Sequence, residues 1–207
     1  MSAPVGSGLA LVLDWDGTVT ERDTLHLVIE EFGDVDVFRA LEQEIGRRLT
    51  LREVIACEME TITAPLDEVV GWLLDTVRIR AGFAELVQRH DPLIVSAGFH
   101  ELIDPVLQRE GVRARVVANR VTADPAGWRA IFPEVEPCSV CGEHCKRVSV
   151  AGLGSFAYVG DGVSDRCVSL AADLVYARDG LARYLDGLGV AYRRFRDLRD
   201  VHVPNVP

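Results

Sequence analysis

Short unbroken apolar runs alternate with segments whose apolar residues recur at helical spacing, and this alternation extends over most of the 207-residue chain. The first run, Leu9 to Leu13, suits a strand buried on both faces, as in a parallel sheet. Further strands are expected at residues 92–96, 114–118, 155–159 and 174–177, with an edge strand at 191–195 and a hairpin at 121–132. Helical segments separate most of these runs. The pattern therefore predicts an α/β fold with a doubly wound, largely parallel sheet, a Rossmann-like core.

Residues 20–82 differ from the rest of the chain because no strand pattern interrupts them. Four apolar stripes at helical spacing follow one another, and Thr50 with Glu53 forms the pattern of a capping box at the start of one helix. We predict an all-helical cap at 20–82, inserted into an α/β core made of 1–19 and 83–207. The alternative is that the same helices belong to the main core.

Charge narrows the function classes. The net charge is −10 at pH 7, which argues against a nucleic-acid partner, because such binding depends on basic contacts to phosphates. No apolar run approaches the length of a membrane span, and the N-terminal residues do not resemble a signal peptide. We expect a cytoplasmic protein without a membrane partner. An anionic substrate would need a local cation or main-chain N–H groups.

Polar side chains stand at the ends of three predicted strands. Asp14 and Asp16 follow the first run, Ser96 ends the second, and Asp161 and Asp165 follow a later one. An acidic turn is the simpler interpretation of the first pair, since Asp is an ordinary turn residue. However, the carboxyl ends of parallel strands meet at one edge of a sheet, where ligands bind. These side chains are therefore expected to converge.

Four converging carboxylates would repel one another unless a cation neutralised them, and an all-oxygen ligand set favours Mg²⁺. Lys146 is the only lysine among 22 basic residues, which suggests a site that needs a compact ammonium, although an ordinary surface position is the alternative. Carboxylates, a hydroxyl, an ammonium and Mg²⁺ in one place suit phosphoryl transfer. One Asp would attack phosphorus and a second would move protons.

Four segments of this chain resemble, in order and spacing, the motifs of haloacid dehalogenase-like (HAD) phosphatases. They are Asp14-Trp-Asp-Gly-Thr-Val-Thr20, Ser96-Ala-Gly98, Lys146 and Gly160-Asp-Gly-Val-Ser-Asp165. The helical insertion after the first motif is similar to the phosphoserine-phosphatase-like branch. The Cys-rich approach to Lys146 and residues 176–179 resemble one metabolite phosphatase within that branch.

The resemblance implies a role for each matching residue. Asp14 would be the nucleophile and Asp16 the general acid and base. Ser96, Ala97 and Lys146 would bind the phosphoryl group, with Trp15 in place of the usual Phe and Ala97 where Gly is common. Ser96 has an alternative as a plain turn residue.

The resemblance also implies one Mg²⁺ per active site. Asp14, Asp161 and the main-chain carbonyl of Asp16 would hold the ion, with Asp165 close by or bonded through water. Asp165 has an alternative as a helix cap.

The family contains several activities, and two features of this chain separate them. Asp16 favours a phosphatase over a dehalogenase, and the absence of Lys from residues 20–82 excludes a phosphonatase that relies on a cap lysine. We expect hydrolysis of a small phosphorylated metabolite through an aspartyl-phosphate. The alternatives are a phosphotransferase with the same intermediate and a non-catalytic phosphate-binding protein. Candidates for substrate contact are Asp23, Arg47, Arg48 and Arg52, which could equally be solvated helix charges.

Three of the five cysteines lie within eight residues. Cys138, Cys141, His144 and Cys145 have a spacing compatible with a structural Zn²⁺, although one Cys-x₂-Cys pair is less than the usual four-ligand pattern. A redox-active pair and a loop of reduced thiols that positions Lys146 are the alternatives. A disulfide is not expected in a reducing cytosol.

Overall fold

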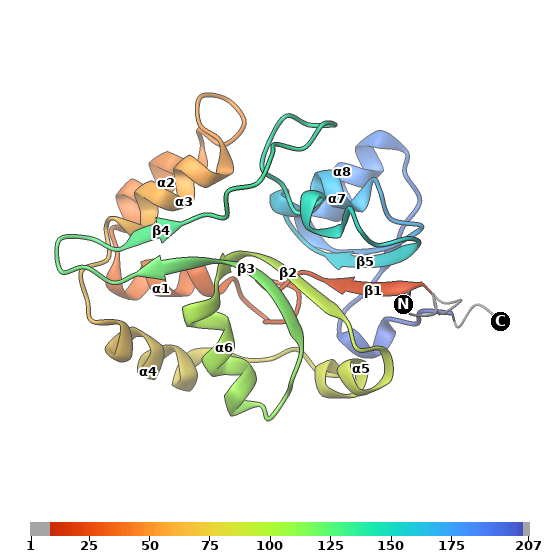
Figure 1. The fold of residues 1–207 in the computed structure, drawn as a ribbon, viewed down its shortest axis with the longest axis horizontal. Helices are drawn as coiled ribbons and strands as arrows, with labels where there is room; N and C mark the ends of the chain where they lie inside the picture. The colour runs from red at the N-terminus through yellow and green to blue at the C-terminus, as the bar shows by residue number, and fades with distance from the viewer. Residues whose placement is uncertain (1–8, 205–207) are drawn as a thin grey trace, which may run out of the picture.

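The computed structural model describes residues 9–204, and a seven-stranded sheet runs through its centre (Figure 1). The strands are β1 (Ala10–Leu13), β2 (Leu93–Phe99), β3 (Arg115–Thr122), β4 (Arg129–Ile131), β5 (Phe156–Gly160), β6 (Leu174–Ala177) and β7 (Arg193–Arg194). Their order is β4-β3-β2-β1-β5-β6-β7, and every neighbouring pair is parallel except β3 and β4. The predicted doubly wound α/β fold is confirmed.

β1 occupies the middle of the sheet and is buried on both faces, as its unbroken apolar run predicts. Leu11 and Leu13 pack into the larger hydrophobic core, whereas Val12 points to the opposite face and packs with Val168. This alternation follows from the two-residue period of a strand. β1 therefore anchors the sheet to both helical layers.

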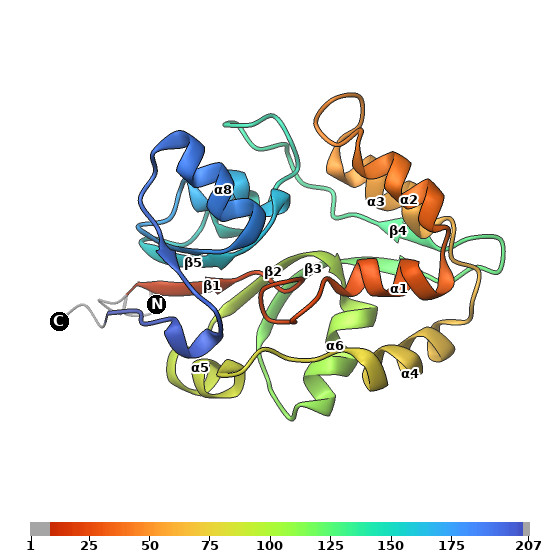
Figure 2. The same ribbon diagram turned by 180° about the vertical axis from the view of Figure 1, so that it is seen from behind.

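Helices cover the two faces of the sheet. The helices are α1 (Thr24–Phe32), α2 (Val35–Glu42), α3 (Leu51–Met59), α4 (Leu66–Thr76), α5 (Phe83–His90), α6 (His100–Arg109), α7 (Arg166–Ser169) and α8 (Asp179–Leu188). α5 and α6 pack on one face, and α7 and α8 on the other (Figures 1 and 2). None of the helices described is long and apolar enough to cross a membrane. The expected cytoplasmic location stays a prediction.

The helical segment between β1 and β2 divides into two parts. α1 and α4 contribute to the same core as α5 and α6, and α4 packs against α6. α2 and α3 pack together and lie beside the β3–β4 hairpin (Figures 1 and 2). Trp128 joins the hairpin to this segment, because its indole N–H donates to the Ala64 carbonyl at 2.8 Å and its main-chain N–H to Ile62 at 2.9 Å.

Several element boundaries differ from those expected. The strand predicted at 114–118 and the first arm of the hairpin form one strand, β3, since nothing breaks the chain between them. β2 continues through the Ser-Ala-Gly motif to Phe99, with an irregular register against β3 after Val95. The predicted edge strand at 191–195 shortens to the two residues of β7.

Candidate active site

The candidate site lies where the chain reverses its direction of travel across the sheet. From β1 the chain builds outward to β2 and β3, and then returns to place β5 on the other side of β1. A crevice forms beyond the carboxyl ends of strands at such a switch point. Asp14 follows β1 and Asp161 follows β5, and the Asp14 N–H donates to the Val159 carbonyl at 2.9 Å. The predicted convergence of strand ends is therefore observed.

Three carboxylates form the centre of the site. Asp14, Asp161 and Asp165 each offer an oxygen within 4.8 Å of the others. Burial and the neighbouring charge of Asp165 raise the pKa of Asp14 well above its ordinary value, and the same two causes raise the pKa of Asp161 to about 6. The site therefore holds more negative charge than its surroundings can stabilise alone.

Lys146 lies against this cluster and is almost completely buried. Its ammonium donates to Asp14 Oδ1 and, at 2.7 Å, to Asp165 Oδ1. Burial lowers the pKa of Lys146, but the charges of the two carboxylates raise it by more, so the side chain stays protonated. The only lysine of the chain thus occupies a position where a compact, charged donor is needed.

Both carboxylate oxygens of Asp165 accept hydrogen bonds from groups of the protein. Its Oδ2 accepts main-chain N–H bonds from Asp161 and Gly162, each at 2.9 Å, and its Oδ1 accepts from Tyr158 at 2.6 Å as well as from Lys146. Burial raises the pKa of Asp165, but the Lys146 charge and the Gly162 hydrogen bond outweigh it, so the pKa is lowered. Its side chain does not cap α7. Asp165 holds the lysine and the β5 loop in place.

Asp16 is hydrogen-bonded to partners outside the three-carboxylate cluster. Its Oδ1 accepts the Thr24 N–H at 2.9 Å and the Thr24 hydroxyl, at the start of α1. Its Oδ2 accepts the Ser96 hydroxyl at 3.3 Å, and Ser96 Oγ accepts the Gly98 N–H at 2.9 Å. Asp16 and Ser96 are therefore neighbours, and a second carboxylate faces the site from a direction different from that of Asp14.

The turn between the two aspartates and α1 requires glycine. Gly17 has φ of +71°, and a Cβ atom there would lie 2.3 Å from Asp161 Oδ2. The close approach lets the Thr18 hydroxyl donate to Asp161 Oδ1 at 3.1 Å. Trp15, fully buried, packs edge-on against Phe83 and anchors the turn from below.

Arg80 supports the same turn, and the sequence analysis missed it. Its buried guanidinium donates to the main-chain carbonyls of Gly17 and Thr18 at 2.8 Å each, and to Thr20 at 3.1 Å. It also reaches the Arg196 carbonyl at 3.2 Å. Every residue has a main-chain carbonyl, so the residues that Arg80 contacts form no recognisable pattern. The sequence therefore did not distinguish Arg80 from the other arginines.

Two neighbouring cavities open onto the site. A cavity of about 390 Å³ is lined by Asp14, Asp16 and Asp161, and one of about 760 Å³ is lined by Ser96 and by side chains of α3 and the β3–β4 hairpin. Both are lined by Ala97 and Lys146. The predicted phosphate contacts thus lie at the junction of an acidic cavity and a larger, mainly apolar one.

The candidate substrate contacts separate into two groups. Arg52 lines the larger cavity, where its guanidinium lies 5.1 Å from the centre of the Phe132 ring. Asp23 lines the smaller cavity and caps α1, and burial together with the charge of Asp16 raises its pKa to about 7. Arg47 and Arg48 are exposed and line neither cavity.

Glu58, which the sequence analysis also missed, lines the smaller cavity from α3. It is 4% exposed, and its Oε1 has no hydrogen-bond partner among the described residues. Burial, and then the charges of Glu42 and Asp23, raise its pKa to about 8. Glu58 is therefore mostly protonated at neutral pH. An acidic residue on an apolar helix face gives no sign of this from sequence alone.

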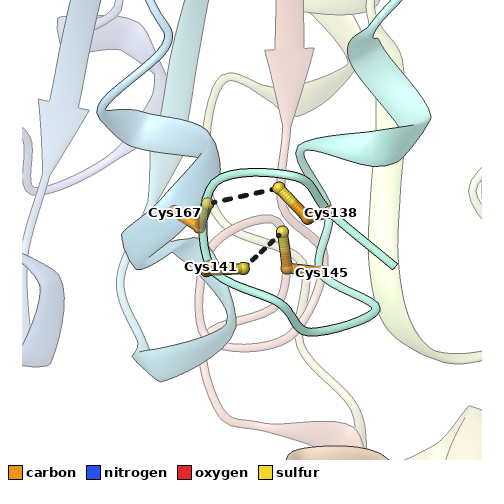
Figure 3. Close-up of side chains that lie close together, drawn as sticks. All are labelled: Cys138, Cys141, Cys145 and Cys167. Carbon is orange, nitrogen blue, oxygen red and sulfur yellow. Dashed lines mark hydrogen bonds between the residues drawn. The ribbon is translucent and has the colours of Figure 1, made fainter. Parts of the chain in front are cut away.

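The cysteine cluster has a different composition from the predicted one. Sulfur atoms of Cys138, Cys141, Cys145 and Cys167 all lie within 4.8 Å of one another (Figure 3). His144 is not part of this group, which Cys167 on α7 joins instead; the predicted Zn²⁺ at Cys138, Cys141, His144 and Cys145 stays a prediction. Sequence spacing could not reveal a partner that stands outside the local motif.

Comparisons with known proteins agree with the fold and indicate the family. A family model described as haloacid dehalogenase-like hydrolase matches residues 11–169. The 2-hydroxy-3-keto-5-methylthiopentenyl-1-phosphate phosphatase of Geobacillus thermodenitrificans is 29% identical to this chain, and the alignment covers 93% of each. The enzyme of the same name from Lysinibacillus sphaericus is 27% identical, with 90% of this chain and 89% of its own length covered.

Solved structures give the same picture of the fold. A phosphoserine phosphatase solved as a phospho-aspartyl intermediate analogue superposes with a TM-score of 0.67 at 17% identity, covering 93% of this chain and 96% of that one. A HAD family hydrolase from Salmonella enterica serovar Typhi superposes with a TM-score of 0.71 at 13% identity, covering 96% and 70%.

The chain belongs to the haloacid dehalogenase-like hydrolase family. Its fold is that of the phosphoserine-phosphatase-like branch, and the predicted class, a phosphoric monoester hydrolase, is confirmed. The metabolite phosphatase that the Cys-rich segment resembles is the one named for the curated relatives.

The contacts of Arg80 lead to a stability prediction. Arg80→Ala leaves several buried carbonyls without a donor, so we expect the free energy of unfolding to fall by about 3 kcal/mol. Arg78→Ala is the matched control, because Arg78 is exposed and reaches one carbonyl, that of Asp75; its effect should stay within about 0.5 kcal/mol. Urea denaturation measures both. Equal effects would show that the carbonyl contacts of Arg80 contribute little.

The raised pKa of Glu58 leads to a pH prediction. Its folded-state pKa of about 8 exceeds the ordinary value of 4.5, so between these values the folded state holds a proton that the unfolded state has lost. The contribution to stability is complete below pH 4.5 and is lost as the pH rises towards 8. Glu58→Gln removes this titration. We compare the free energy of unfolding of the variant with that of the wild type. As the pH rises from 5 to 8, this difference should shift in favour of the variant by on the order of 2 kcal/mol, after allowing for solvent screening.

Urea denaturation of both proteins at pH 5, 6.5 and 8 measures this difference. Glu60→Gln, at an exposed position two residues along the chain, is the control and should follow the wild type at every pH. A constant difference between Glu58→Gln and wild type across this range would contradict the assignment.

Proposed function

We propose that this protein hydrolyses a phosphomonoester of a small metabolite through an aspartyl-phosphate on Asp14. The observation that carries the proposal is the buried contact of the Lys146 ammonium with both Asp14 and Asp165. Burial and neighbouring charge raise the pKa of Asp14. The carboxylate therefore needs adjacent positive charge to remain an anionic nucleophile. Lys146 supplies part of it.

Asp14 attacks phosphorus with a carboxylate oxygen, and the bond from phosphorus to the alcohol oxygen breaks. Asp14 Oδ1 is held by Lys146 and by the Trp15 N–H at 2.6 Å, which fixes the orientation of the carboxylate. Ser96 and Lys146 bind phosphoryl oxygens at the junction of the two cavities. Water then attacks the phosphorus of the aspartyl-phosphate, which releases inorganic phosphate and restores Asp14.

Asp16 moves the proton in both steps. It protonates the departing alkoxide and later takes a proton from the attacking water. Its carboxylate lies in the same cavity as Asp14 but is oriented by Thr24 and Ser96, which supports separate roles for the two aspartates. Asp165, whose oxygens are occupied by protein donors, is a positioning residue in this scheme.

The donor set fits a divalent cation. Three carboxylates against one ammonium leave two negative charges, and all the available ligand atoms are oxygens, which Mg²⁺ prefers. Asp14, Asp161 and the main-chain carbonyl of Asp16 would hold the ion. When bound, Mg²⁺ supplies positive charge that offsets the carboxylates and the phosphoryl oxygens.

The larger cavity is the proposed place for the organic part of the substrate. It is lined mainly by apolar side chains, including Leu51 and Phe132, with Arg52 and Asn119 as polar contacts. This lining supports a metabolite with an apolar part, such as the 2-hydroxy-3-keto-5-methylthiopentenyl-1-phosphate for which the curated relatives are named. We also propose that residues 20–82, with α3 at the cavity, act as a cap that excludes bulk water.

The first functional prediction concerns the two aspartates. Asp14→Asn should lower kcat to below roughly one thousandth of the wild-type value, and Asp16→Asn by about 10²- to 10⁴-fold. Asp67→Asn, at an exposed position on α4, is the control and should keep full activity. Mg²⁺-dependent release of inorganic phosphate measures all three.

Acid-quenched reactions with phosphorus-labelled substrate test the intermediate separately. Label should be found on wild-type protein and be removed by hydroxylamine, and it should be absent from Asp14→Asn. Turnover without any dependence on Asp14 would overturn the mechanism. Label transferred to added glycerol in place of water would favour the phosphotransferase.

The second functional prediction concerns the substrate. In a panel with phosphoserine and sugar phosphates, we expect kcat/KM for 2-hydroxy-3-keto-5-methylthiopentenyl-1-phosphate to be higher by at least about tenfold, because its methylthio group fits the apolar cavity. Phe132→Asp, at a residue that lines the larger cavity and not the smaller one, should remove this preference while leaving phosphoserine little changed. A preference for phosphoserine would overturn the substrate assignment and leave the phosphatase mechanism intact.

A further inference from the structure

Four cysteine side chains from two separate segments converge beside the active site. Cys138, Cys141 and Cys145 stand on the loop that leads to Lys146, and Cys167 stands on α7. Figure 3 shows their sulfur atoms pointing towards one another. We propose that these four side chains bind one structural Zn²⁺ as thiolates, and that this ion joins the loop to α7. Binding would release the four thiol protons to solvent.

The sulfur spacing suits a tetrahedral ion. Zn²⁺ binds thiolate sulfur at about 2.3 Å, so two ligands of one tetrahedral ion lie about 3.8 Å apart. The Cys138 and Cys167 sulfurs are 3.9 Å apart, those of Cys141 and Cys145 are 3.5 Å apart, and all four lie within 4.8 Å of one another. Two disulfides would instead draw the sulfurs together in pairs, to about 2.0 Å.

The loop conformation supports the same conclusion. Gly142 adopts φ of +75°, and its N–H donates to the Cys138 carbonyl at 2.8 Å, which closes a tight turn around the Cys-x₂-Cys pair. This turn directs two sulfurs to one side of the loop, as a shared metal ligand pair requires.

The loop has little else to hold it in one conformation. Residues 132–147 contain no helix or strand, and only Cys138 and Lys146 among them are buried. A loop of this length whose main apolar anchor is the partly buried Phe132 at its start is costly to order. However, it has to deliver Lys146 to a buried position. A bound metal would supply the ordering that the hydrophobic core does not.

The zinc site would also affect catalysis, by fixing the position of Lys146. Lys146 directly follows Cys145, and Cys167 lies two residues after Asp165, which bonds the Lys146 ammonium at 2.7 Å. One ion would therefore fix both ends of the Lys146–Asp165 contact. The four cysteines are positioning residues in this arrangement and touch no reacting atom.

Metal analysis of purified protein tests the proposal without any activity assay. Protein expressed with added zinc and purified under reducing conditions should carry about one zinc per chain, measured by elemental mass spectrometry. Cys167→Ser should lower zinc affinity by more than about tenfold. Cys57→Ser, at an exposed cysteine outside the cluster, and His144→Ala are the matched controls and should keep the metal.

Cobalt gives a second readout that holds even if Cys167→Ser fails to fold. Co²⁺ bound to wild-type protein should show tetrahedral d–d bands and a strong thiolate-to-metal charge-transfer band. An all-oxygen site of carboxylates cannot give the charge-transfer band. Wild-type protein that takes up neither zinc nor cobalt would overturn the proposal. Loss of metal in His144→Ala, or two disulfides in protein isolated under anaerobic conditions, would do so as well.

Activity adds a test of the coupling. Removing the zinc should lower kcat more than it raises KM, because the nucleophile loses its fixed ammonium while the larger cavity keeps its remaining lining. The zinc content is independent of the proposed reaction, so the site would stand even if the protein proved not to hydrolyse phosphomonoesters by that route. Unchanged kcat after zinc removal would overturn the positioning role.

Discussion

The buried ammonium of Lys146 between Asp14 and Asp165 is the interaction on which the rest of the site depends. Buried charges are stable only when they are paired and hydrogen-bonded, and here two carboxylates bond one lysine while a third, Asp161, lies beside them. The contact requires the ends of β1 and β5 and the loop before β5 to meet at one point. The strand order provides this meeting point, because β1 and β5 are neighbours although more than 140 residues separate them.

The convergence of these strand ends could be predicted because it follows from local patterns. Apolar runs identify the strands, and a parallel sheet places their carboxyl ends at one edge. Lys146 could also be singled out, since no other lysine occurs in the chain. The pattern did not reveal which partners each of these side chains would face. Asp16 and Asp165 are both acids at strand ends, but Asp16 faces Thr24 and Ser96, whereas Asp165 is enclosed by donors of its own loop and Tyr158.

The residues that sequence reasoning missed share a physical cause. Arg80 acts through main-chain carbonyls, which every residue possesses, and Glu58 has its pKa raised by burial that appears only when α3 packs over the cavity. Cys167 joins the cysteine cluster from 22 residues beyond Cys145. In each case the effect depends on a tertiary contact, whereas the prediction relied on neighbours in sequence. Local spacing therefore points to the nearby His144, whereas the tertiary structure brings the distant Cys167 to the cluster.

The two candidate metal sites differ in their ligand atoms, which are carboxylate oxygens in one and cysteine sulfurs in the other. An all-oxygen cluster with two excess negative charges suits a hard divalent ion, and a four-sulfur cluster suits zinc, so neither site should compete for the other's ion. Lys146 lies between them, bonded to the carboxylates and adjacent in sequence to Cys145. A lysine at this junction has its charge balanced by one cluster and its position held by the other. The core, which leaves residues 132–147 largely exposed, supplies neither.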